Sequence, residues 1–177
     1  MPQKSFVHKG RIFDFVREKV SLPNGVSKFY DIVKHRGAVV IIPLISKNKV
    51  ILIKQYRVSI KKYILELPAG SIDVEEKPFA CAKRELAEET GYFSKKIKSV
   101  GKLIPCPGYS TEILYIYKAE DLIKHRKIFG KQNVFEKDED EVIKPIVYSR
   151  EQVKKMIKNG KIIDAKTIAS FALIGWL

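Results

Sequence analysis

Two apolar stretches in the N-terminal half dominate the hydrophobic pattern of this chain. Residues 37–43 (GAVVIIP) and 50–55 (VILIKQ) are rich in β-branched side chains, and the polar turn 46–49 separates them. Unbroken apolar runs of this length are typical of strands that are covered on both faces. The pattern therefore predicts a buried β-hairpin.

Shorter segments of similar character predict further strands on either side of this hairpin. Residues 22–25 (LPNG) are a turn signal between two of them. Pro145 restricts another candidate to a sheet edge or a bulge, because proline has no N–H to donate. The additional strand candidates are 11–21, 26–34, 63–67, 113–117 and 142–148.

A helix is predicted over residues 78–90, where Pro78 can occupy the first turn and Gly91 can end the helix. Apolar side chains recur there at helical spacing and are expected to face a core. These side chains belong to Phe79, Ala82 and Leu86.

Two further helices are predicted at the C-terminal end. Ser149 and Gln152 have the spacing of a capping box, and Gly160 can stop that helix. Asp164 can cap the last helix, which ends near Trp176. Strands interleaved with helices predict an α/β fold in which helices cover a mixed sheet.

Composition and charge narrow the class of protein. The 177 residues suffice for one domain with a substantial core, and 45% of them are hydrophobic. No apolar run is long enough to cross a bilayer, and residues 1–13 lack the apolar core of a secretory signal, so a cytoplasmic protein is expected. The net charge of +14 helps to attract anions such as phosphorylated small molecules.

The two cysteines, Cys81 and Cys106, are too few for a disulfide framework and fit no zinc-type spacing. Cys81 falls within the predicted helix 78–90, where the role of a small buried apolar side chain is expected. The three histidines are scattered along the chain, and none of them is assigned a chemical role.

The segment 70–92 carries the candidate chemistry. Its helix places Glu85, Glu88 and Glu89 within about one turn, where like charges repel one another. Arg84 alone cannot neutralise three carboxylates, whereas a hard divalent cation with oxygen ligands can. Taken without the glycines and the arginine that frame it, such a cluster would more often be a solvated helix face.

The complete pattern is G-x5-E-x7-R-E-U-x-E-E-x-G-U, where U is a bulky apolar residue. It resembles the signature of the Nudix hydrolases at every position. The resemblance implies an α/β/α sandwich with a mixed sheet, on which the motif forms a loop-helix-loop. It also divides the chain into a small N-terminal antiparallel strand extension for dimerisation, residues 1–35, and a Nudix hydrolase domain, residues 36–177.

The resemblance further implies roles for individual motif residues. The site would hold Mg²⁺, with Mn²⁺ as the alternative ion. Arg84 and Glu76 would form an ion pair behind the carboxylates that orients them, and Glu88 would share the site as a ligand and in catalysis. The metal ligands implied are Glu85, Glu88, Glu89 and the backbone carbonyl of Ala69.

Segments outside the motif are similar to ADP-ribose pyrophosphatases. These segments are 55–57 (QYR), 66–70 (ELPAG) and 107–112 (PGYSTE), and the resemblance runs from about residue 30 to the C-terminus. It implies that substrate contacts come from these segments and from the strands before them. The expected substrate-binding residues are Tyr30, Arg36, Arg57, Glu66 and Gly108.

Arg36 and Arg57 are candidates for phosphate contacts, because a planar guanidinium matches phosphate oxygens. Ordinary surface arginines are the alternative. Tyr30 or Phe29 could stack on adenine, although aromatic residues in strands more often belong to the core.

The acidic run 136–141 (EKDEDE) is the second chemical candidate, although alone it fits a solvated loop. In the subfamily that the chain resembles, a glutamate from such a loop closes on the substrate and positions or deprotonates the attacking water. Glu139 best matches that catalytic base, and Glu141 matches a supplementary metal contact.

These inferences predict a Mg²⁺-dependent homodimeric hydrolase that converts ADP-ribose into AMP and ribose 5-phosphate. Hydrolysis of another ADP-sugar or nucleotide sugar is the nearest alternative. A non-catalytic ligand-sensing or RNA-binding module is the alternative from another class. The intact motif carboxylates argue against that module, and no aromatic and basic RNA-binding motif is present, so nucleic acid is not an expected partner.

Overall fold

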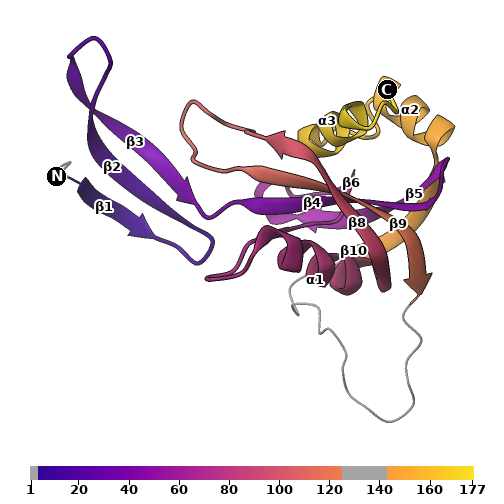
Figure 1. The fold of residues 1–177 in the computed structure, drawn as a ribbon. Coiled ribbons are helices and arrows are strands. Elements are labelled where there is room, and N and C mark those ends of the chain that lie inside the picture. Colours follow the sequence, from indigo (N-terminus) through magenta and orange to yellow (C-terminus); the bar gives the residue numbers. More distant parts are fainter. Residues whose placement is uncertain (1–3, 125–142) are drawn as a thin grey trace.

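The N-terminal part of the chain forms a small antiparallel sheet of its own. The computed structural model describes residues 4–124 and 143–177. Strands β1 (Lys4–Lys9), β2 (Phe13–Ser21) and β3 (Ser27–His35) are neighbours in that order, and Gly25 adopts a positive φ of 83° in the tight turn between β2 and β3. Figure 1 shows that this sheet projects from the rest of the molecule. The antiparallel strands predicted at the N-terminus are confirmed, and their role in dimerisation stays a prediction.

A larger seven-stranded sheet forms the body of the molecule. Its strands run in the order β10-β5-β4-β9-β8, with β6 beside β5 and β7 beside β4. Strands β4 and β9 are parallel and the other pairs are antiparallel, so the sheet is mixed, as predicted. The strands are β4 (Ala38–Ser46), β5 (Lys49–Arg57), β6 (Lys62–Glu66), β7 (Ala69–Ser71), β8 (Tyr92–Leu103), β9 (Leu114–Lys124) and β10 (Ile143–Ser149).

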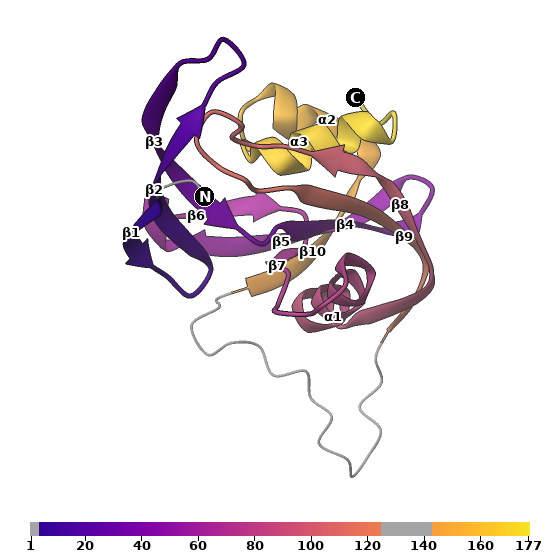
Figure 2. The ribbon, with the colours of Figure 1, turned by 60° about the vertical axis from the view of Figure 1, so that its left-hand side comes forward.

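Helices cover both faces of this sheet. Helix α1 (Pro78–Thr90) lies on one face, and α2 (Arg150–Lys158) and α3 (Ala165–Leu173) lie on the other. Figures 1 and 2 show the same three layers from two directions. Within the described parts of the chain, no helix combines the length and the hydropathy of a membrane-spanning segment.

Strand β4 explains why the central apolar run of the sequence is unbroken. Val40 and Ile42 belong to the core on the side of α2 and α3, whereas Val39 and Ile41 belong to the core on the side of α1. Successive side chains of a strand point to opposite faces, so a strand between two helical layers needs apolar residues at every position. All four of these side chains are fully buried.

The predicted starts of the three helices and the end of the first are confirmed because they depend on local capping, whereas the last helix ends at Leu173, before the predicted Trp176. Helix α1 begins at Pro78, and Gly91 follows it with a positive φ of 74°. The Ser149 side chain accepts a hydrogen bond from Gln152 N at the start of α2, which completes the capping box. Asp164 accepts a hydrogen bond from Thr167 N in the same way at the start of α3.

The prediction that Phe79 faces the core is wrong. Its ring packs against Tyr117 at a centroid distance of 6.0 Å and carries the Lys83 ammonium at 4.6 Å, yet 43% of the residue is exposed. Phe79 is the second residue of α1, and the fully buried stripe of the helix begins two residues later. Cys81, Ala82 and Leu86 form that stripe, as the helical spacing predicted for the last two.

Strands β1, β7 and β8 were absent from the sequence prediction. The longest of them, β8, reads YFSKKIKSVGKL and shows little alternation of apolar and polar side chains. It lies at one edge of the large sheet, where lysines discourage pairing with another chain. Strand β10 lies at the opposite edge, which agrees with the position predicted for Pro145.

Candidate active site

Helix α1 turns two carboxylates of the motif toward the sheet. Glu85 and Glu89 lie one turn apart, and their relative exposures are 9% and 2%. Glu89 Oε2 accepts a hydrogen bond from the backbone N–H of Ala69 at 2.9 Å. Glu85 lies against Gly70, where a Cβ atom would stand 1.9 Å from Glu85 Oε1. The short strand β7 and α1 therefore form the two walls of one acidic site.

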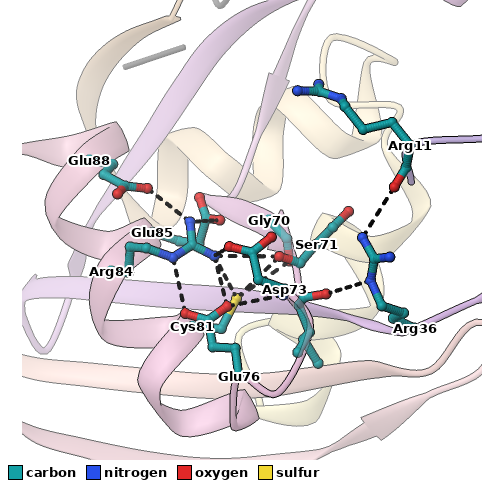
Figure 3. Close-up of polar contacts among 11 residues, drawn as sticks. Arg11, Arg36, Gly70, Ser71, Asp73, Glu76, Cys81, Arg84, Glu85 and Glu88 are labelled. Carbon is teal, nitrogen blue, oxygen red and sulfur yellow. Dashed lines mark hydrogen bonds and ion pairs between the residues drawn. The ribbon is translucent and has the colours of Figure 1, made fainter. Parts of the chain in front are cut away.

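Arg84 forms hydrogen bonds with three of the four motif carboxylates, Glu76, Glu85 and Glu88 (Figure 3). Its Nε and Nη2 donate to the two oxygens of Glu76 at 3.0 and 2.9 Å. Its Nη1 donates to Glu85 Oε1 at 2.6 Å and to Glu88 Oε2 at 3.0 Å. Nη2 also reaches the carbonyl of Ser71 at 3.4 Å. One guanidinium thus connects the end of β7 with three glutamates.

The hydrogen bonds from Arg84 lower the pKa of Glu76, whose partial burial opposes this shift. The bonds to Glu76 and the charge of Glu85 also raise the pKa of Arg84, so the guanidinium stays charged. Beside it, burial raises the pKa of the Cys81 thiol, which donates to the carbonyl of Ser71 at 3.5 Å. Cys81 is therefore a structural side chain, as the sequence predicted.

The donor chemistry of this site fits a hard divalent cation. Arg84 contributes one positive charge to a cluster that includes the carboxylates of Glu76, Glu85 and Glu88, and Glu89 adds a further buried carboxylate. Within residues 4–124 and 143–177, no three acidic, cysteine or histidine side chains converge closely enough to hold a metal. In this conformation Glu85 and Glu88 both accept hydrogen bonds from Nη1 of Arg84.

A second ion-pair network lies next to the acidic site. Arg57 Nε and Nη2 each donate to one oxygen of Glu66 at 2.7 Å. Lys166, from the first turn of α3, also donates to Glu66 and reaches Asp164 Oδ1 at 2.9 Å. Glu66 is fully buried, so its two oxygens are held between two cations. A direct contact between Glu66 and substrate, as the resemblance implied, would require this arrangement to open.

The pKa values of this network are consistent with charged partners. Burial would raise the pKa of Glu66, but the hydrogen bonds from Arg57 and the charge of Lys166 lower it below the ordinary value. Burial would lower the pKa of Arg57, but Glu66 raises it, and the charges of Glu89 and Asp164 add to that effect. Arg57 therefore lies within electrostatic range of the acidic site.

Arg36 connects the N-terminal sheet with the loop after β7. Its Nε donates to the carbonyl of Ile72 at 3.1 Å, and its Nη2 donates to the carbonyl of Arg11 at 3.2 Å (Figure 3). A cavity of about 260 Å³ borders Arg36 and is also lined by Lys34 and Asp14. The phosphate contact of Arg36 stays a prediction, and the structure shows its guanidinium bound to two backbone carbonyls.

The other expected site residues lie on other elements of the fold or outside the described residues. Tyr30, on β3, is 38% exposed, and neighbouring Phe29 is 47% exposed, so neither is a core side chain. Gly108 lies in the turn between β8 and β9, whose Tyr109 carbonyl accepts from Val33 N of β3. Glu139 and Glu141 fall in residues 125–142, which lie outside the described part of the chain.

Two polar residues of α3 beside this site carried no recognisable sequence signal. Lys166 contacts Glu66, and Thr167 Oγ1 accepts a hydrogen bond from Leu67 N at 2.8 Å. Both contacts bridge 100 positions in the chain. In the sequence, Asp164 marked the start of α3 as its capping residue. This signal did not indicate which residues the first turn of α3 contacts.

The family model of the NUDIX domain matches residues 34–171. The chain is 35% identical over 164 residues to the ADP-ribose pyrophosphatase of Bacillus subtilis (strain 168), covering 93% of this chain and 85% of that protein. It is also 35% identical over 162 residues to the methanol dehydrogenase activator of Bacillus methanolicus, covering 92% and 84% of the two chains.

Other similarities extend this comparison. The chain is 30% identical over 169 residues to the GDP-mannose pyrophosphatase of Citrobacter koseri, covering 92% of this chain and 84% of that protein. A solved structure described as an ADP compounds hydrolase matches with a TM-score of 0.79 and 25% identity, covering 98% of this chain and 91% of that chain. The structural match confirms the expected α/β fold class.

Proposed function

This chain belongs to the Nudix family and is a Nudix pyrophosphatase, and we propose that its substrate is ADP-ribose. The relative from Bacillus subtilis, which is named an ADP-ribose pyrophosphatase, supports this choice of substrate. The structural observation that carries the proposed hydrolysis is the buried pair of Glu85 and Glu89. Both lie on one face of α1, where Glu85 contacts Gly70 and Glu89 accepts from the N–H of Ala69.

The proposed reaction is hydrolysis of the pyrophosphate bond. Water adds its hydroxyl to one phosphorus atom, and the bridging oxygen leaves on the other phosphate and takes up a proton. ADP-ribose and water thereby yield AMP and ribose 5-phosphate. Arg57 offers a guanidinium for phosphate binding, and Glu139 is proposed as the base that takes the proton of the water.

We assign a divalent cation, Mg²⁺ or Mn²⁺, to the acidic site. Such an ion, when bound, neutralises phosphate oxygens and lowers the pKa of a coordinated water. Arg84 holds Glu85 and Glu88 by hydrogen bonds and is anchored by Glu76, so it keeps these carboxylates near the site. The proposed ligands are Glu85, Glu88, Glu89, Glu141 and the carbonyl of Ala69.

A panel of nucleoside diphosphate compounds tests the substrate. The panel contains ADP-ribose, ADP-glucose, GDP-mannose and NADH, each incubated with the protein and Mg²⁺, and the products are identified by chromatography. We expect ADP-ribose to be cleaved with the highest kcat/KM and to release AMP. GDP-mannose is the second candidate substrate, because the chain is similar to a GDP-mannose pyrophosphatase. A clear preference for GDP-mannose would contradict ADP-ribose as the substrate.

Removal of metal distinguishes a catalyst from a ligand-sensing or RNA-binding module. Chelation by EDTA should stop the release of AMP, and added Mg²⁺ or Mn²⁺ should restore it. Binding of ADP-ribose without turnover, together with tight and salt-sensitive binding of RNA, would contradict the proposed catalysis.

We also propose that the protein acts in the cytoplasm as a homodimer in which the N-terminal strands contribute to the interface. The three-stranded sheet exposes several large apolar side chains, which supports a covered surface in the assembly. Light scattering after gel filtration should give about twice the chain mass of 20.3 kDa. A monomer at assay concentration would contradict this assembly. The exposed side chains are Val7, Phe13, Val26, Phe29 and Tyr30.

A further inference from the structure

The most fully buried charged side chain among the described residues lies next to the acidic site and forms ion pairs with two cations. Glu66, at the end of β6, is 0% exposed, and its oxygens accept from Arg57 and from Lys166. A buried carboxylate is stable only when its partners are well placed, because desolvation of a charge is expensive. The positions of Arg57 and Lys166 are therefore linked through one side chain.

Lys166 lies in the first turn of α3, and several contacts hold this turn in place. Asp164 caps this turn and also accepts from Lys166 Nζ at 2.9 Å. The next residue, Thr167, is fully buried and accepts from Leu67 N at 2.8 Å, one residue beyond Glu66. These contacts anchor α3 to the segment between β6 and β7, so Lys166 approaches Glu66 from a rigid support.

Arg57 is the member of this network that is partly exposed to solvent. Its Nε and Nη2 face Glu66 in a bidentate pair, and its side chain is 36% exposed. Within residues 4–124 and 143–177, no hydrogen bond engages its Nη1. The charge of Glu89 contributes to the raised pKa of Arg57, so the two side chains lie within electrostatic range of each other. An anionic phosphate held at the acidic site would meet a guanidinium whose orientation is set by Glu66.

We propose that Lys166 is a positioning residue for the hydrolysis reaction, acting through Glu66 to hold the guanidinium of Arg57 toward the substrate phosphates. The proposal rests on the proposed function, because it assigns Arg57 to phosphate binding. Lys166 itself does not touch the substrate. Its ammonium shares the charge of Glu66 and keeps that carboxylate in the orientation that receives both N–H groups of Arg57.

A double-mutant cycle tests this coupling. Lys166→Met keeps the length of the side chain and removes its charge, and Arg57→Ala removes the group that Lys166 is proposed to position. We expect Lys166→Met to lower kcat/KM for ADP-ribose about tenfold in the wild-type background and less than about twofold in the Arg57→Ala background. Equal losses in both backgrounds, or no loss in the wild type, would overturn the proposal.

Two further variants separate positioning from folding. Lys161→Met removes an exposed lysine of the loop between α2 and α3, and it should leave kcat/KM unchanged. Lys166→Arg retains a cation at the same place and should recover most of the activity that Lys166→Met loses. If Lys166→Arg were as impaired as Lys166→Met while both melt at the wild-type temperature, the charge of Lys166 would not be the cause.

A measurement without substrate distinguishes this proposal from the proposed function. The side-chain Nε–H of Arg57, assigned by its absence from the spectrum of Arg57→Lys, should give a protected NMR signal in the wild-type protein. We expect Lys166→Met to shift this signal and to speed its exchange with water, and Lys161→Met to leave it unchanged. An unchanged signal in Lys166→Met would overturn the positioning role, whereas absence of cleavage of the whole substrate panel would contradict only the proposed function.

Discussion

The backbone of Gly70 lies directly against the carboxylate of Glu85. A Cβ atom at position 70 would stand 1.9 Å from Oε1 and 2.5 Å from Oε2 of that residue. Both distances are shorter than any non-bonded contact that such atoms tolerate. The absence of a side chain at Gly70 therefore allows a buried glutamate of α1 to reach the short strand β7.

The first prediction is that Gly70→Ala displaces Glu85 and impairs catalysis. A displacement of about 1 Å in a catalytic arrangement can lower the rate about a hundredfold, and we expect a loss of kcat/KM of that order. Gly160→Ala is the matched control, because Gly160 has a positive φ of 72° but no atom within 4 Å of its would-be Cβ. That control should lower Tm without lowering kcat, and equal activity of both variants would contradict the role of Gly70.

The second prediction concerns the buried carboxylate of Glu89. Glu89→Gln retains an oxygen that can accept from Ala69 N and removes the negative charge. We expect kcat to fall about a hundredfold or more, because electrostatic stabilisation at a metal site supplies several kcal/mol. Steady-state kinetics at saturating Mg²⁺ provide the measurement.

Glu75→Gln is the control for this prediction, since Glu75 is an exposed residue of the same motif. It should retain the wild-type kcat. Near-normal turnover of Glu89→Gln at saturating Mg²⁺ would show that Glu89 is not needed for metal binding or catalysis.

The third prediction concerns the pH dependence of stability. The folded-state pKa of Glu66 lies below its ordinary value of 4.5, so its charged form stabilises the fold above pH 4.5. This contribution is lost as the pH falls through the lowered pKa. The Tm of Glu66→Gln should therefore lie below that of the wild type at pH 7, and the two values should converge as the pH falls from 4.5 through the lowered pKa.

Thermal unfolding from pH 3 to pH 7 measures this difference. We expect Glu66→Gln to lower Tm by about 2 °C or more at pH 7, because the substitution removes the negative charge that pairs with both Arg57 and Lys166. Glu75→Gln should follow the wild-type curve. A Tm difference that stays constant over the whole pH range would contradict a charged Glu66.

The fourth prediction concerns the catalytic base, which lies outside the described residues. Glu139→Gln should lower kcat by about a hundredfold to ten-thousandfold and leave KM for ADP-ribose within a few-fold, because a base acts mainly in the transition state. Glu141→Gln should raise the concentration of Mg²⁺ required, and Glu136→Gln should have little effect. If Glu139→Gln retained full kcat while Glu112→Gln or Glu141→Gln lost it, the base would lie elsewhere.

The sequence by itself determined the features that depend on neighbouring residues. Pro78 and Gly91 bound α1, and the Ser149 and Gln152 side chains cap α2, because capping satisfies backbone groups within one turn. The spacing of Glu85 and Glu89 likewise fixes both carboxylates on one helix face, whatever packs against it. The acidic motif and its helix were therefore predictable from local chemistry.

Only the tertiary structure decided which polar residues are buried and paired. Glu66 lies between Arg57 and Lys166, and its contact with Lys166 spans 100 positions in the chain. Phe79 has the spacing of a core residue and remains exposed at the start of α1. Burial depends on which surfaces of distant elements meet in the fold. A periodic pattern in the sequence shows which residues share a face and leaves open what covers that face.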